Sequence, residues 1–208
     1  MVEVSTGAWP MAISGIVESV VSTQAPDGDW SVAALGLHGE ADHTPDDPLR
    51  ARTWGNTRTK RNLARRGTGH VQFVDDPLDF VEAALGRWEA PDPIVDRAAA
   101  WTEVRAERVE SGESRGTTWI EWELRPMEST VEHRSVPHPS RGFGAILEMT
   151  VAASRLGVPG YDDDRLRRRL EEYSDIVRRC GGVRELHALD RIDTLTEWDP
   201  DTADAEHQ

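Results

Sequence analysis

Residues 56–85 read NTRTKRNLARRGTGHVQFVDDPLDFVEAAL, and this stretch sets the expected order of elements. The pattern of polar and apolar residues predicts a short helix over residues 57–66, which the following glycine ends. Residues 70–74 read HVQFV, in which two valines and a phenylalanine predict a short strand. Asp76 stands before a proline, which is typical of a helix start, so a second helix is expected over residues 78–85.

Two predicted hairpins flank this stretch. Residues 15–24 and 30–38 are rich in apolar and β-branched side chains, and the sequence APDGD between them is typical of a tight turn. Residues 40–50 are expected to be a polar loop. Residues 102–109 and 117–124 alternate polar and apolar side chains around the connection SGESRG, which predicts a second hairpin. Strands arranged in this way favour a small antiparallel barrel over a parallel sheet.

The spacing of the apolar residues changes near residue 140. Residues 142–157 and 162–182 both show helical spacing, and each run closes at a glycine. We therefore expect an α+β protein with a barrel over residues 1–138. Residues 139–198 are expected to form a helical region that packs on the barrel or on a dimer partner, and the polar tail 199–208 is expected to be disordered.

The charge balance excludes several kinds of partner. The chain has 38 acidic and 24 basic residues, a net charge of −14. This charge repels nucleic acid and anionic membranes, so neither is expected as a partner. Arginine almost wholly replaces lysine, and this bias resembles that of proteins from salt-loving archaea. No signal peptide or apolar run of membrane-spanning length is visible, so a cytoplasmic location is expected.

Residues 48–74 contain no Asp or Glu, although they carry seven of the 24 basic residues. Lys60, the only lysine, lies within them. Short hydroxyl and amide side chains are interleaved with the cations: Thr53, Asn56, Thr57, Thr59 and Asn62. Cations combined with directional donors suit a bound phosphate, and the free N–H groups of a helix start would face the same anion. The plainer interpretation is a solvated, arginine-rich helix start, and the stretch alone supports both.

Sequence signatures of other chemistries are missing. The chain has no P-loop, no G-x-S-x-G elbow and no H-E-x-x-H pair, and Gly142 and Gly144 lack the third glycine of a dinucleotide-binding loop. Cys180 is the only cysteine, which excludes an intrachain disulfide and a thiolate metal cluster. No metal site is therefore predicted, and the catalytic residues stay undetermined.

Four pieces of the sequence together resemble a known family. They are SVAALGL at 31–37, NTRTKRNL at 56–63, VQFVDDPLDFVEAAL at 71–85 and RGFGAILEMTVAASRL at 141–156. Their order resembles an archaeal family of unknown function whose members have the split-barrel fold that binds flavin mononucleotide (FMN). That family is related to the flavin reductases. The resemblance extends from about Gly15 to Leu189 and implies an antiparallel split β-barrel with C-terminal helices.

The resemblance also implies which residues hold FMN. They are Thr57, Arg58, Thr59 and Lys60 at the phosphate, Val32, Ala33, Ala34 and Leu35 along the ring edge, Gln72 near the ring, and Arg141 from a second subunit. The second subunit enters because these barrels bind flavin at a dimer interface. Ala34-Leu35 stands where the family often has Pro-Met, and Gln72 stands where it often has Asn.

Three functional hypotheses follow. The first is a homodimeric FMN-binding oxidoreductase of flavin-reductase type, which takes hydride from a reduced nicotinamide and passes it to an unknown acceptor. The second is a non-catalytic flavin carrier, which would bind FMN without accelerating the oxidation of a reduced nicotinamide. In the third, residues 50–66 form a docking surface for an acidic partner or RNA, and Trp54 is the only aromatic residue there that could stack on a base.

Overall fold

A computed structural model describes residues 3–114, 116–136 and 139–196. The chain divides into two compact units. The first contains the chain up to Asp75 together with Trp88–Val136, and the second contains Asp76–Arg87 and the chain after Val136. Residues 76–87, which were expected within a barrel spanning residues 1–138, thus group with the C-terminal helices.

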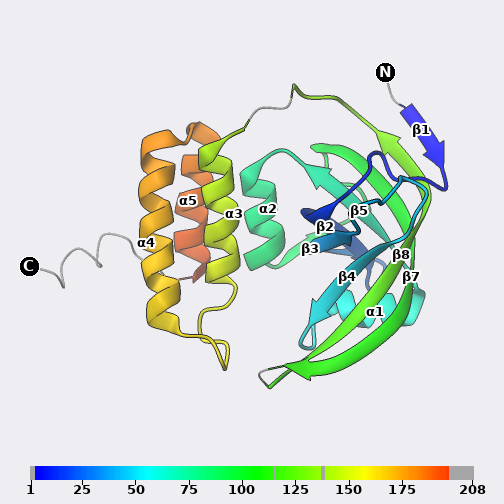
Figure 1. Cartoon of the computed structure of the whole chain (residues 1–208), viewed down its shortest axis with the longest axis horizontal. Coiled ribbons are helices and arrows are strands. Elements are labelled where there is room, and N and C mark those ends of the chain that lie inside the picture. Colours follow the sequence, from blue (N-terminus) through cyan, green and yellow to red (C-terminus); the bar gives the residue numbers. More distant parts are fainter. Residues whose placement is uncertain (1–2, 115, 137–138, 197–208) are drawn as a thin grey trace, which may run out of the picture. The chain divides into compact units, whose positions relative to one another are not determined.

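The first unit is a closed antiparallel barrel of six strands, which confirms the predicted fold class (Figure 1). The barrel strands are β2 (Gly15–Gln24), β3 (Trp30–Gly39), β4 (Leu49–Trp54), β5 (Thr68–Val74), β7 (Ala98–Ser114) and β8 (Thr117–Val131). Their order is β8-β4-β3-β2-β5-β7, and β7 pairs with β8 to close the ring. Two short strands are added at the margin: β1 (Glu3–Thr6) pairs with β8, and β6 (Trp88–Ala90) pairs with β3.

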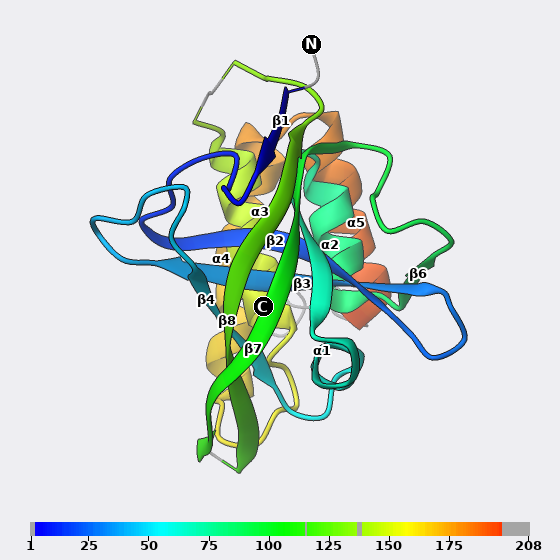
Figure 2. The ribbon, with the colours of Figure 1, turned by 90° about the vertical axis from the view of Figure 1, so that its right-hand side faces the viewer.

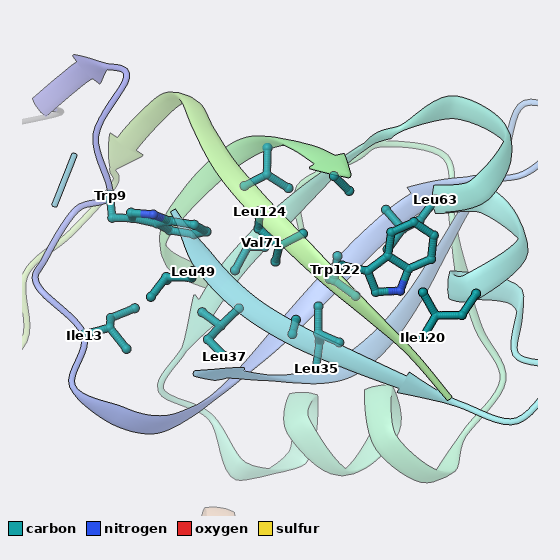
Figure 3. Close-up of a cluster of buried hydrophobic side chains, with 14 residues drawn as sticks. Trp9, Ile13, Leu35, Leu37, Leu49, Leu63, Val71, Ile120, Trp122 and Leu124 are labelled. Carbon is teal, nitrogen blue, oxygen red and sulfur yellow. The ribbon is translucent and has the colours of Figure 1, made fainter. Parts of the chain in front are cut away.

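The barrel interior is filled by alternate residues of the strands (Figure 3). Leu35 and Leu37 of β3 and Leu124 of β8 are at most 5% exposed. Figure 3 shows Trp9 toward one end of this cluster and Trp122 toward the other. The indole nitrogen of Trp122 donates a hydrogen bond of 2.9 Å to the Thr53 hydroxyl, so this buried polar group is satisfied.

The helix α1 (Arg58–Arg66) forms where the sequence predicts it and follows β4. Figure 2 shows it almost end-on, below β3. Leu63 joins the barrel core, and Asn62 is also buried because its amide nitrogen donates to the carbonyl and hydroxyl oxygens of Thr23 at 3.3 and 3.2 Å. Gly67 ends the helix in the left-handed conformation with φ 67°.

The second unit contains four helices around their own apolar core (Figure 1). They are α2 (Pro77–Leu85), α3 (Arg141–Ala153), α4 (Asp163–Cys180) and α5 (Val183–Thr196). The residue before each of the first three accepts a hydrogen bond from a backbone N–H of its first turn, as an N-cap does. An ion pair between Arg191 of α5 and Glu82 joins α5 to α2. None of the helices in the described ranges is long and apolar enough to cross a membrane.

Two elements of the barrel differ from the sequence prediction. The strand β4 was not predicted, and its first residues fall in the expected loop 40–50. The inward residues of β4 are buried: Leu49, Ala51 and Thr53. Because two of them are small and arginines stand between them, the sequence of β4 lacks the large apolar residues that would predict a strand. The second hairpin is also longer than predicted, because β7 and β8 continue well past the apolar runs.

His70 of β5 gives the barrel a stability that depends on pH. Its ring is half-buried and makes edge contacts with Trp30 and Trp101, at 5.1 and 6.0 Å between ring centroids. Burial lowers the pKa of His70 below its ordinary value of 6.5, and the opposing attraction of Glu103 is smaller. The unfolded chain therefore takes up this proton more readily, so stability is full above pH 6.5 and falls as the pH drops below it.

We expect His70→Gln to reduce the loss of stability between about pH 7.5 and about pH 5.5. The measurement is the urea midpoint of each protein at both pH values. His38→Gln, which changes an exposed histidine of β3, is the matched control and should keep the wild-type pH dependence. An unchanged pH dependence in the His70 variant would contradict the assignment.

Candidate functional site

The strand β3 has a short section with no ladder partner on one of its edges. Its first edge pairs with β2 along its whole length. On the second edge, β6 pairs with residues 30–32 and β4 pairs with residues 37–38. Residues 33–36 thus have no strand partner on this edge among the described residues. We call residues 33–36 the open edge.

The open edge offers backbone groups and little side-chain bulk. The Leu35 carbonyl oxygen accepts a hydrogen bond of 2.6 Å from the Ser19 hydroxyl of β2, so the backbone groups of Leu35 face β2. Backbone direction alternates along a strand, which turns the N–H and C=O groups of Ala34 and Gly36 toward the open edge. The residues there can therefore hydrogen-bond a flat polar ligand as a neighbouring strand would.

The open edge exists because β4 follows β8 and not β3. All six residues of β4 pair with β8, from Leu49 with Leu124 to Trp54 with Trp119. Only Arg50 and Ala51 pair with β3. The chain then turns at Gly55, whose φ of 65° is left-handed, and enters α1.

The start of α1 is suited to an anion. The Thr57 hydroxyl caps the helix and accepts a hydrogen bond of 3.2 Å from the Lys60 N–H. The N–H groups of Arg58 and Thr59 lie in the first turn, where a helix offers no acceptor. The first turn also contains no acidic residue, so the partial positive charge of the helix terminus is not offset within α1 itself.

Two cationic side chains fold back over the turn before α1. The Lys60 ammonium donates a hydrogen bond of 3.1 Å to the Gly55 carbonyl oxygen. Arg61 donates to the backbone carbonyl oxygen of Asn56 at 2.8 Å and to its side-chain oxygen at 3.3 Å. These bonds hold both charges beside the turn from which α1 starts, where neutral carbonyl groups accept their hydrogen bonds.

Other cations of the acid-free stretch are neutralised by residues distant in sequence. Arg50 pairs with Glu123 and Arg52 with Glu121, each at 2.8 Å, across the β4–β8 ladder. Arg58 pairs with Glu89 of β6. The Arg52 guanidinium also lies 4.1 Å from the ring centre of Trp119. The absence of acid in residues 48–74 therefore overstates the positive charge that a ligand would meet.

The predicted site residues fall into four groups. The open edge includes Ala33, Ala34 and Leu35, with Val32 at its border, and the start of α1 includes Asn56, Thr57, Arg58, Thr59 and Lys60. The helix α1 contacts β3 and β4, which brings these two groups into one region of the barrel. Arg141 is an exposed residue of the helical unit, where it begins α3.

Asn62 and Gln72 use their amides inside the barrel unit. Gln72 is fully buried. Its amide nitrogen donates to the Ser22 hydroxyl and the Pro93 carbonyl oxygen, both at 3.1 Å, and its amide oxygen accepts from the Val95 N–H at 2.7 Å. The amide nitrogen of Asn62 likewise donates its hydrogen bonds to Thr23. Both amides therefore bind groups within the barrel unit, and direct contact with a ligand would require these bonds to break.

Sequence reasoning missed one feature of this region, the acidic residue Glu89. Glu89 lies in a strand of three residues, too short for a periodic signal, and it meets Arg58 from 31 positions away. Within the described ranges no group of three or more His, Cys, Asp or Glu residues is placed to hold a metal ion.

Comparison with solved structures supports this fold. The FMN-bound protein MM1853 from Methanosarcina mazei has 21% sequence identity and a TM-score of 0.74, and the match covers 88% of this chain and 96% of that one. The styrene monooxygenase flavin reductase from Pseudomonas putida S12 matches at 18% identity with a TM-score of 0.38, over 61% of this chain and 93% of that one. This second likeness is too distant to carry an argument. No curated protein matches the chain.

Family models match both parts of the sequence. Residues 17–133 match the N-terminal domain of a protein of unknown function, DUF447, and residues 140–194 match the second model of that name. The first match alone covers more than half of the chain. This protein therefore belongs to the DUF447 family.

Proposed function

We propose that this protein binds FMN, with the phosphate at the start of α1 and the edge of the isoalloxazine ring along the open edge of β3. The observation that carries the proposal is the proximity of these two features. One offers free N–H groups and cations, and the other offers backbone groups beside small residues. The FMN-bound structure of MM1853, which has the same fold, supports this choice of ligand.

The residues present fit the two ends of the cofactor. A phosphate monoester carries nearly two negative charges, which Lys60, Arg61 and the N–H groups of the first turn can hold by charge-assisted hydrogen bonds. The isoalloxazine ring has polar atoms along one edge, and the open edge offers backbone donors and acceptors to match them. Ala34 and Gly36 keep side-chain bulk away from that edge, so a planar ring can approach the backbone closely.

We further propose that the protein is an oxidoreductase resembling the flavin reductases. Bound FMN supplies hydride transfer, and the residues described above would bind it and orient its ring. A reduced nicotinamide is the proposed donor, and the acceptor has no assigned chemistry. The proposed active form is a homodimer in which Arg141 of a second copy reaches the cofactor.

The first test is the visible absorption spectrum of the purified protein after incubation with FMN and desalting. We expect retained flavin bands and accelerated oxidation of a reduced nicotinamide. Retained flavin without this acceleration would leave a flavin carrier as the function. If a folded sample retained no flavin, FMN binding would be wrong, and a docking surface over residues 50–66 would become the alternative.

We expect Lys60→Gln to weaken FMN binding about tenfold, or about 1.4 kcal/mol, because it removes a cation held beside the phosphate position. Arg66→Gln is the matched control, since it removes the same charge from the exposed last turn of α1. Flavin fluorescence titration measures both affinities. Equal affinities for the two variants would show that Lys60 acts only through net charge.

A further inference from the structure

The carboxylate of Glu89 contacts one of the cationic side chains at the start of α1. It pairs with Arg58, the first residue of the helix. The pair is partly solvent-accessible, with 31% of the Arg58 side chain and 46% of the Glu89 side chain exposed. A helix start favours negative charge, and α1 has no acidic residue in its own first turn. Glu89 therefore brings a carboxylate from another strand to the side chain of the first residue of α1.

The position of Glu89 is set by β6. This strand pairs with the second edge of β3, with Trp88 opposite Val32 and Glu89 opposite Ser31. It occupies the residues immediately before the open edge. Glu89 thus lies at the junction between the proposed ring position and the proposed phosphate position, and a ligand that uses both would meet its charge.

We propose that Glu89 is an internal competitor for the cofactor phosphate and is released from Arg58 when the phosphate binds. This inference rests on the proposed function. Arg58 can pair with the carboxylate or bind the phosphate in its place, and a partly exposed ion pair contributes little stability, so exchange is feasible. Glu89 thereby lowers the affinity for phosphorylated flavin below what the cations alone would give.

If the phosphate displaces Glu89 from Arg58, removing the Glu89 charge should tighten the binding of FMN. Glu89→Gln should bind FMN at least about threefold more tightly than the wild type, because a negative charge near the phosphate is removed. Its affinity for riboflavin, which has the same ring and no phosphate, should not change. The variant without ligand should melt at a slightly lower temperature, since the ion pair between Arg58 and Glu89 is lost.

Glu121→Gln is the matched control. It makes the same change of net charge and also removes a carboxylate from an arginine, but its partner Arg52 lies on the β4–β8 ladder. Its affinity for FMN should stay at the wild-type value. Fluorescence titrations of the three proteins with FMN and riboflavin at one salt concentration give all the required ratios.

Each outcome of these titrations either supports the role of Glu89 as a competitor of the phosphate or overturns it. Weaker or unchanged FMN binding by Glu89→Gln would overturn the inference and make Glu89 a residue that only supports Arg58 or β6. Equal tightening toward riboflavin would also overturn it, because the effect would not concern the phosphate. If the wild type and Glu89→Gln both failed to bind FMN, the proposed function would be wrong and the inference would fall with it.

Discussion

The geometry of the site depends on how β4 pairs with its two neighbouring strands. A strand in a closed barrel has two edges to satisfy, and β4 pairs fully with β8 but only briefly with β3. The backbone groups of β3 that this leaves unpaired are polar and need a partner or solvent. The same departure of β4 brings α1 to the region of the open edge. The short pairing between β4 and β3 thus leaves a row of backbone hydrogen-bonding groups on β3 and brings the start of α1 next to it.

The positive charge in this region is smaller than the order of residues in the sequence suggests. The acid-free stretch suggests a strongly positive surface, but the acidic partners of three of its six arginines come from β6 and β8. Lys60 and Arg61 are the cations that turn back toward the start of α1. A modest local charge is consistent with selecting a small dianion. It is a weak basis for a general polyanion surface in a chain of net charge −14.

The sequence was informative where structure depends on local patterns. The β2–β3 hairpin, α1 with Gly67 after it, and α2 after Asp76 follow from turn, stop and cap residues. It was uninformative where structure depends on pairing between distant segments. The small inward residues of β4 hide its strand character, and no local pattern indicates that, among the described residues, the second edge of β3 has no strand partner at residues 33–36. The burial of Gln72 likewise depends on a loop more than twenty residues away.

The helix α2 has a consequence for how this family is divided into domains. The matched family models separate the sequence between residues 133 and 140, so α2 is counted with the N-terminal part. Physically, its fully buried Val81 belongs to the core of α3, α4 and α5. The helical unit is therefore discontinuous, with one helix encoded inside the barrel sequence. A gene fragment cut at that boundary would leave Val81 and the rest of α2 with the barrel sequence, apart from the core to which Val81 belongs.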